Sequence, residues 1–281
     1  MPSMTKADPD IVALDVTRAL DEDIGTGDVS AQLIPADQTA HARIISREPA
    51  VLSGIAWADA AFRRVSPNVR IEWAAADGDS LFPEQSLCLI SGPARPMLTA
   101  ERVALNFLQT LSATATVTRQ FVEAVEGTGA QILDTRKTLP GLRYAQKKAV
   151  TDGGGMNHRM GLHDMVMLKE NHIRAAGSIT EAVRAAGVIG RDLPLEVEVE
   201  TLEQLDETLA AGVKRVLLDN FSLEQLGEAV EINRGRAKLE SSGNVSLETV
   251  RDVAETGVDY ISIGALTKHV QAVDLSMRFV D

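Results

Sequence analysis

Residues 195–219, LEVEVETLEQLDETLAAGVKRVLLD, contain a strand, a helix and a second strand in succession. Leu195–Val199 and Arg215–Leu218 are short apolar runs rich in β-branched residues, as expected of buried strands. Between them, Thr201-Leu-Glu-Gln204 has the spacing of a capping box, which marks a helix start, and Gly212 marks its end. The stretch therefore predicts two strands joined by a helix.

The same alternation recurs through the second half of the chain. Short apolar runs typical of strands lie at 131–133, 165–168, 195–199, 215–218, 237–239 and 260–263. Helical patterns lie between most of them, at 143–151, 178–187, 201–211, 222–233 and 246–256. This alternation predicts a parallel sheet curled into an α/β barrel. An open doubly wound sheet is the alternative, which the absence of a G-x-G-x-x-G motif after a first strand disfavours.

The first hundred residues have a different pattern, which predicts a small α/β unit with a mostly antiparallel sheet. Helices are expected at 10–22 and 55–65, and strands at 41–47, 51–53, 69–73 and 87–90. A long helix follows at 97–126, with a bend or break expected near Ser112–Thr116 because hydroxyl and β-branched residues weaken a helix. We predict an N-terminal domain over 1–108 and a catalytic barrel over 109–269. The tail 270–281 is a candidate to pack back onto the first domain.

Composition and charge limit the function classes. Apolar residues make up 44% of the 281 residues and charged residues 24%, which is typical of a globular protein. We expect no signal peptide, because Met1–Asp10 is polar, and no membrane span, because no apolar run approaches about 20 residues. Cys88, the single cysteine, has no disulfide partner in the chain and cannot form a zinc site alone, which fits a reducing cytoplasm.

The net charge of −12 is unevenly distributed. Residues 135–174 contain eight Lys/Arg and three Asp/Glu, so this segment is strongly cationic within an acidic chain. Such a segment suggests a site for a small polyanion, the alternative being a solvated basic helix face. Nucleic acid is not an expected partner, because the chain is acidic and the basic segment has only Tyr144 among aromatic residues.

Polar residues follow the predicted strands, where a barrel carries its functional groups. These residues are Asp134–Lys137, Lys169, Glu198, Glu200, Asp219, Asn220, Glu240–Asn244, Gly264 and Ala265. Glu198 and Asp219 lie on neighbouring strands, where carboxylates can bind ribose hydroxyls, hold a metal or offset positive charge on a sugar carbon. The alternative is that they form salt bridges to nearby cations.

A cationic wall is expected opposite these acids. Its members are Arg136, Lys137, His158, Arg159 and Lys169. Arginine binds a carboxylate through two parallel hydrogen bonds and lysine acts as a point charge, so the set suits an acceptor with two adjacent carboxylates. For His158 the alternative is a hydrogen-bonded structural histidine. Gly153–Gly155, just before it, predicts a loop that can approach a ligand or move over it.

Two glycine-containing loops are the remaining candidate binding sites. Ser241–Ser246 and Ile263–Leu266 are each expected to run directly into a helix, where backbone N–H groups bind phosphate. The alternative is a tight turn with a helix cap. The sequence contains no G-x-S-x-G elbow, no His or Cys cluster with metal-ligand spacing, and no Walker loop.

Eight motifs together are highly specific. They are Glu101–Gln109, Asp134–Arg143, Gly153–Arg159, Leu168–His172, Glu196–Glu200, Leu217–Phe221, Glu240–Asn244 and Gly257–Tyr260. In this order, and over nearly the whole chain, they resemble the motifs of the quinolinate phosphoribosyltransferases. The resemblance implies an N-terminal α/β sandwich, a C-terminal open α/β barrel, and a homodimer whose active sites are completed by the partner's N-terminal domain.

The resemblance also implies a reaction and roles for residues. The family transfers phosphoribose from phosphoribosyl pyrophosphate to quinolinate with decarboxylation, giving nicotinate mononucleotide for NAD synthesis, with Mg²⁺ as cofactor. By this resemblance Lys137, Glu198 and Asp219 are catalytic, and Glu198 and Asp219 hold Mg²⁺ directly, through water or through pyrophosphate. Substrates are contacted by Glu101, Arg102, Thr135, Arg136, Lys137, His158, Arg159, Lys169, Glu198, Asp219, Ser242, Gly243, Asn244, Ile263, Gly264 and Ala265.

Two other functions stay open at this point. A related phosphoribosyltransferase that uses nicotinate, or the molybdenum-operon paralogue of the family, would keep the phosphate loops but need fewer groups for a second carboxylate. Arg102, Arg136 and Arg159 are all present here. A protein that only binds quinolinate or a sugar phosphate would not need both acids and the full set of cations.

Overall fold

The computed structural model of the protein describes residues 6–190 and 192–280. These residues form two compact units, each assembled from separate stretches of chain. The antiparallel unit consists of 6–119, 138–154 and 266–280, and the parallel unit of 120–137, 155–190 and 192–265. The predicted domains, 1–108 and 109–269 with the tail 270–281, follow chain order, whereas the units are interleaved.

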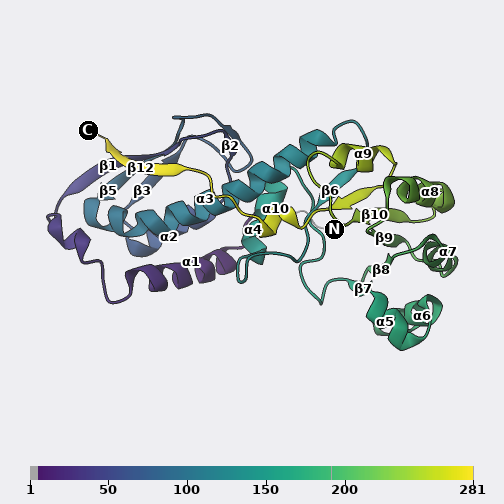
Figure 1. Ribbon diagram of the computed structural model, residues 1–281. Coiled ribbons are helices and arrows are strands. Elements are labelled where there is room, and N and C mark those ends of the chain that lie inside the picture. The colour runs from purple at the N-terminus through teal and green to yellow at the C-terminus, as the bar shows by residue number, and fades with distance from the viewer. Residues whose placement is uncertain (1–5, 191, 281) are drawn as a thin grey trace. The chain divides into compact units, whose positions relative to one another are not determined.

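The antiparallel unit contains a four-stranded sheet in the order β12-β1-β5-β3 and a short pair, β2-β4 (Figure 1). Every strand pairing in the unit is antiparallel. The strands are β1 (Thr39–Ser46), β2 (Ala50–Val51), β3 (Arg70–Trp73), β4 (Ser80–Leu81), β5 (Ser86–Pro93) and β12 (Leu275–Val280). β12, from the tail, pairs with β1, and its pattern was not predicted as a strand.

Helices cover this sheet and supply most of its core. They are α1 (Pro9–Ile24), η1 (Ser30–Leu33), α2 (Ile55–Val65), α3 (Ala94–Ala124) and α4 (Arg143–Asp152). The predicted break in α3 is wrong, because the helix is continuous from Ala94 to Ala124, whereas the bend stays a prediction. Thr116 and Thr118 donate their hydroxyl hydrogens to the carbonyls of Ser112 and Thr114, each at 2.7 Å, so the hydroxyls are satisfied without opening the helix.

The parallel unit is built on a six-stranded parallel sheet in the order β6-β11-β10-β9-β8-β7. Its strands are β6 (Gln131–Leu133), β7 (Val166–Leu168), β8 (Leu195–Val199), β9 (Arg215–Asp219), β10 (Lys238–Ser242) and β11 (Tyr260–Ser262). Its helices are α5 (Glu170–Ala176), α6 (Ile179–Ile189), α7 (Leu202–Ala210), α8 (Leu223–Asn233) and α9 (Val250–Glu255), while α10 (Ala265–Lys268) spans a junction between the units in the chain. The six predicted strands and their parallel arrangement are confirmed. None of the described helices is long and apolar enough to cross a membrane.

The two faces of the parallel sheet differ in polarity. Helices α6, α7 and α8 lie along one face (Figure 1), and residues such as Val197, Val216 and Leu239 are fully or almost fully buried there. Strand register places Glu198 beside Leu217 and Asp219 beside Ser242 on the opposite face. Polar side chains at the carboxyl ends of the strands therefore gather on the face away from the helices.

Gly153, at the C-terminal end of α4, makes its close contact with α3. A Cβ atom at this position would lie 2.5 Å from the carbonyl oxygen of Ala115 and 2.7 Å from Cβ of Thr118. The Gly153 carbonyl accepts a hydrogen bond from Nε of Arg119 at 3.0 Å. Gly153 thus packs against a helix of the same unit, and the approach of the Gly153–Gly155 loop to a ligand stays a prediction.

We predict that Gly153→Ala lowers the free energy of unfolding by about 1–3 kcal/mol, because the added methyl group would press on the backbone of α3. Gly187→Ala is the matched control. Gly187 lies inside α6 with nothing near its Cβ position, so alanine should raise the free energy of unfolding by about 0.5–1 kcal/mol. Urea denaturation measures both variants, and equal stabilities would contradict the packing role.

Candidate active site

A cavity of about 460 Å³ opens at the carboxyl ends of the parallel strands. All of its lining residues belong to the parallel unit. They are Thr135, Arg136, Lys137, His158, Arg159, Met167, Lys169, Glu198, Leu217, Asp219, Glu240, Ser242 and Ser262. Nine of these were predicted from the sequence as substrate-contacting residues, so segments far apart in the chain bring most of the predicted site into one place.

The arginines of the cavity lie close to one another. Arg159 is largely buried, and its Nη1 donates to the carbonyl of Met165 at 3.4 Å. Burial lowers the pKa of Arg159, and the positive charge of Arg136 lowers it further. Arginine stays protonated at any ordinary pH, so the lowered pKa means that the positive charges of Arg136 and Arg159 repel each other. A bound anion would reduce this repulsion.

The acids of the cavity already have polar partners. Lys169, the residue before α5, forms an ion pair with Glu198 at the end of β8. Asp219, at the end of β9, accepts a hydrogen bond from Nδ2 of Asn220 at 2.9 Å. Both carboxylates line the cavity. For Glu198, the ion pair with Lys169 is therefore compatible with a role in binding substrate.

The segment that carries His158 is held against β6. Met156 donates its N–H to the carbonyl of Ile132 at 2.8 Å. The buried Asp134 carboxylate then accepts the His158 N–H at 2.9 Å and the Asn157 amide at 2.7 Å. Asp134 was not given this role from the sequence. A carboxylate directly after a strand, followed some twenty residues later by Asn-His-Arg, was the available signal.

His158 has a hydrogen bond at each ring nitrogen. Its Nδ1 accepts the backbone N–H of Arg159 at 2.6 Å, and its Nε2 lies 2.8 Å from Oε2 of Glu196. An Nδ1 that accepts cannot carry a proton, so Nε2 carries it and donates to Glu196. These contacts are those of the Nε2–H tautomer, and the place of His158 in the cationic wall stays a prediction from the sequence.

Glu196 is fully buried yet charged. Burial opposes ionisation, but the hydrogen bond and electrostatic attraction of His158, together with the positive charge of Arg215, prevail and lower the pKa of Glu196. Sequence reasoning missed Glu196 and Arg215, and it named Glu240 only among the polar residues that follow the strands. The period-two pattern of β8, which puts Glu196 on the same face as Glu198, could have indicated the first of them.

The two glycine loops approach their neighbours closely. Gly243 has φ +112°, and a Cβ atom there would overlap the side chain of Asn220 and lie 3.2 Å from its Cα. A Cβ atom at Gly264 would lie 2.9 Å from Cδ of Lys137. The loop after β10 does not run directly into a helix as predicted, because α9 begins at Val250. Asn244, Ile263 and Ala265 are not among the residues that line the cavity.

Glu101 and Arg102 lie on α3 in the antiparallel unit. Arg102 is exposed, whereas Glu101 is half-buried, and burial raises the pKa of its carboxyl. Neither residue belongs to the unit that contains the cavity. Their predicted contact with substrate stays a prediction.

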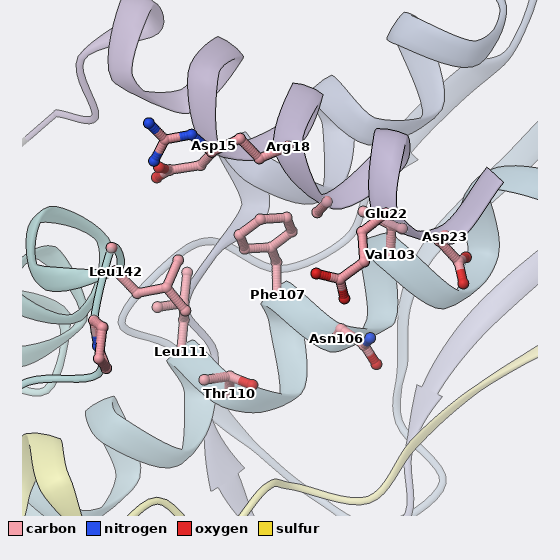
Figure 2. A pocket seen from close by; sticks show the side chains of 13 residues that line it. Asp15, Arg18, Glu22, Asp23, Val103, Asn106, Phe107, Thr110, Leu111 and Leu142 are labelled. Atoms are coloured by element: carbon pink, nitrogen blue, oxygen red, sulfur yellow. The ribbon is translucent and has the colours of Figure 1, made fainter. Parts of the chain in front are cut away.

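A second cavity, of about 370 Å³, lies within the antiparallel unit (Figure 2). Its lining includes Asp15, Arg18, Glu22 and Asp23 on α1, opposite Phe107 on α3. Burial raises the pKa of Asp15 despite a 3.0 Å hydrogen bond from Trp57. With three acids and one arginine, this lining does not suit a polyanion, so the cationic cavity of the parallel unit is the candidate active site.

We expect inorganic pyrophosphate to raise the thermal unfolding temperature of the protein, and Arg159→Gln to lose most of this shift. The reason is that burial and the charge of Arg136 disfavour the charged form of Arg159, which a bound anion would stabilise. Arg184→Gln is the matched control, because Arg184 forms an exposed pair with Glu181 on α6. A full shift in Arg159→Gln would show that pyrophosphate binds elsewhere.

Comparison with known proteins agrees with this geometry. Residues 23–112 match the family model of the quinolinate phosphoribosyl transferase N-terminal domain, and residues 114–278 match that of the C-terminal domain. The carboxylating nicotinate-nucleotide pyrophosphorylase of Mycobacterium leprae is 44% identical over 269 residues, covering 93% of this chain and 95% of that protein. Its chloroplastic namesake in Oryza sativa subsp. japonica is 42% identical over 284 residues, covering 94% and 76%.

Solved structures give the same result. The nicotinate-nucleotide pyrophosphorylase of Francisella tularensis superposes with a TM-score of 0.96 at 42% identity, and the match covers 100% of both chains. Both family domains are present in order, and the relatives match over most of their length. This chain therefore belongs to the quinolinate phosphoribosyl transferase family and is a phosphoribosyltransferase.

Proposed function

We propose that the chain transfers the phosphoribosyl group of phosphoribosyl pyrophosphate to quinolinate and removes one carboxylate. The products are nicotinate mononucleotide, pyrophosphate and CO₂, a step of NAD synthesis. The observation that supports this most directly is the single cavity in which Arg136, Arg159 and Lys137 face Glu198 and Asp219. The cations suit two anionic substrates, and the acids suit the sugar between them.

The acceptor would be bound by the arginines. Quinolinate has two adjacent carboxylates, and Arg136 and Arg159 offer planar guanidinium groups that bind carboxylates through paired hydrogen bonds. Nicotinate has one carboxylate and would leave part of this positive charge without a counter-ion. A protein that only binds quinolinate has no use for Glu198 and Asp219, which is why we favour catalysis.

The chemistry would proceed by displacement at the anomeric carbon. The ring nitrogen of quinolinate forms a bond to this carbon while the bond to pyrophosphate breaks, and Lys137 and Lys169 stabilise the departing charge. Glu198 and Asp219 favour the cation-like sugar carbon. The ring nitrogen, now positive, accepts the electron pair of the breaking bond to the C2 carboxylate. CO₂ leaves and C2 takes up a proton.

Glu198 and Asp219 would also hold Mg²⁺, directly or through water. Their carboxylate oxygens are the hard ligands that Mg²⁺ prefers, and Mg²⁺ is commonly held by one or two carboxylates together with substrate phosphates. The ion would offset the negative charge of the pyrophosphate. Since Lys169 pairs with Glu198, it can neutralise the same carboxylate before the substrate arrives.

The 5′-phosphate would be bound by the backbone of the two glycine loops, at Ser242, Gly243, Asn244, Ile263, Gly264 and Ala265. The positive φ and close approach at Gly243 favour this, because they leave the loop no room for a side chain beside Asn220. Thr135 accepts the Lys137 N–H at 3.0 Å and so fixes the turn that carries Lys137 between the loops and the pyrophosphate.

The active enzyme would be a homodimer in which Glu101 and Arg102 of one subunit reach the cavity of the other. The exposed position of Arg102 on α3 is consistent with such a contact. A cytoplasmic location and the absence of nucleic-acid and membrane partners remain predictions from the sequence.

Mass spectrometry of the purified protein with phosphoribosyl pyrophosphate, Mg²⁺ and either quinolinate or nicotinate tests the function. We expect nicotinate mononucleotide and CO₂ from quinolinate and no product from nicotinate. Chelating Mg²⁺ should abolish turnover. Lys137→Ala should lower kcat by at least about 100-fold, because it removes a charge that stabilises the leaving group.

Three outcomes would contradict parts of this proposal. Product from nicotinate alone would overturn the acceptor. No product from either acceptor, with quinolinate still bound, would favour a binding protein. Full turnover by Lys137→Ala would remove Lys137 from the catalytic groups.

Mixing two inactive variants tests the shared site. Arg102→Ala and Lys137→Ala should each be nearly inactive, because each damages both sites of its own dimer. In a mixture whose subunits have exchanged, a heterodimer would contain one intact site, so about one quarter of wild-type activity should return. No recovery after exchange, verified by mass spectrometry of differently tagged subunits, would place Arg102 outside the partner subunit's site.

A further inference from the structure

A layer of charged side chains lies inside the parallel unit, on the same sheet face as the cavity. Nε of Arg215 donates to Oε1 of Glu196 at 2.7 Å, and its Nη2 donates to Oε2 of Glu240 at 2.5 Å. The guanidinium also packs 4.7 Å from the centre of the Tyr260 ring. Both carboxylates are fully buried, and the three charged residues come from the adjacent strands β8, β9 and β10. Arg215 therefore bridges three neighbouring strands.

Stability alone does not account for this layer. Removing two carboxylates and a guanidinium from water costs several kcal/mol per ion, and well-packed apolar side chains often serve as well or better. The apolar face of the same strands shows that the chain fills interior space with valine and leucine elsewhere. The layer is therefore best explained by what it holds, which is the ring of His158.

A metal ion is the first alternative to consider, because His158, Glu196 and Glu240 have ligand atoms within 4.8 Å of one another. Arg215 argues against it. Its guanidinium already bonds one oxygen of each carboxylate, and the Nε2 of His158 lies at hydrogen-bond distance from the remaining oxygen of Glu196. The counter-charge that a metal would supply is thus provided by Arg215.

Glu196 is the member of the layer that decides the state of His158. One of its oxygens accepts from Arg215 and the other from His158, so the carboxylate acts as a double acceptor. Glu240 is the weaker partner, since its Oε1 lies 3.5 Å from Nε2 of His158 and has no hydrogen-bond partner among the described residues. Glu196 is therefore the nearer acceptor for the His158 ring.

We infer that Glu196, held by Arg215, is a positioning residue that fixes His158 as the Nε2–H tautomer and thereby places Arg159 in the cavity. Arg215 donates to Glu196, Glu196 contacts Nε2 of the His158 ring, and Nδ1 of that ring accepts the Arg159 N–H. His158 accordingly contributes neither a base nor a charge, because both of its nitrogens are engaged in this chain. Its task is to hold the backbone of the arginine that binds an anionic acceptor.

The isosteric variant Glu196→Gln tests this inference. Glutamine has one acceptor oxygen, and Arg215 can only donate, so the amide oxygen must face Arg215. The amide NH₂ then faces His158 and requires a bare Nε2, which moves the ring proton to Nδ1 and against the Arg159 N–H. We expect the tautomer to switch or become mixed in Glu196→Gln. The kinetic part of the test rests on the proposed function: KM for quinolinate should rise by about tenfold or more while kcat changes less.

Nuclear magnetic resonance of protein labelled with ¹⁵N at histidine measures the tautomer, because protonated and bare ring nitrogens resonate apart. The signals of His158 are those that vanish in His158→Gln. The matched control is Lys238→Gln, which removes an exposed ion pair with Asp259 from β10 and should change neither the tautomer nor KM.

A wild-type spectrum with the proton on Nδ1, or with both nitrogens protonated, would overturn the inference, and this result needs no folded variant. A Glu196→Gln spectrum that matches wild type would overturn it as well. Absence of turnover in the wild-type protein would instead count against the proposed function, while the tautomer measurements would still decide the role of Glu196.

Discussion

Side chains two residues apart on a strand lie on the same side of a sheet, and the rest of this structure depends on that alternation in the parallel unit. One face of the strands is apolar and packs beneath the helices. The other face carries Glu196 and Glu198 on β8, Arg215 and Asp219 on β9, and Glu240 on β10. Parallel strands buried on both faces are usually apolar throughout. Here one face carries charged side chains, so each of them needs a partner of opposite charge from a neighbouring strand or from the substrate.

The charged groups on this face have two kinds of partner, other side chains of the protein and a bound anion. Arg215 binds one oxygen of each of two buried carboxylates, Glu196 and Glu240. In the cavity, burial and the charge of Arg136 disfavour the charged form of Arg159, so a bound anion would stabilise it. A protein with a net charge of −12 therefore presents a local positive site. Because four cationic side chains line this cavity, small anions can be attracted there while the net negative charge of the chain disfavours large polyanions.

The strands of the parallel unit were predictable from apolar runs of strand length, and cavity residues such as Lys137, Lys169 and Asp219 from polar residues just after those runs. His158 and Arg159 follow no predicted strand and were predicted from the cationic segment and the resemblance to the family. What could not be predicted depends on pairing between distant segments. The tail was expected to pack onto the first domain, but its pattern gave no sign of a strand that pairs with β1. Arg215 begins β9, and the order along the chain does not tell which strands flank β9. The 2.6 Å contact between Nδ1 of His158 and the next residue's N–H is a matter of local geometry that residue type does not determine.

The interleaving of the two units has a consequence for how the chain can be divided. Residues 138–154 leave the parallel unit directly after Lys137, contribute α4 to the antiparallel unit, and return just before Asn157 and His158. A fragment ending near residue 113 would lack α4 and β12, and buried alanines of α3 such as Ala104 would lose neighbours such as Ala145 and Ala149 from the same core. Neither unit is thus a continuous stretch that could be exchanged between proteins by a single recombination event. Because the two units are interleaved along the chain, the antiparallel unit and the catalytic groups of the parallel unit are inherited together.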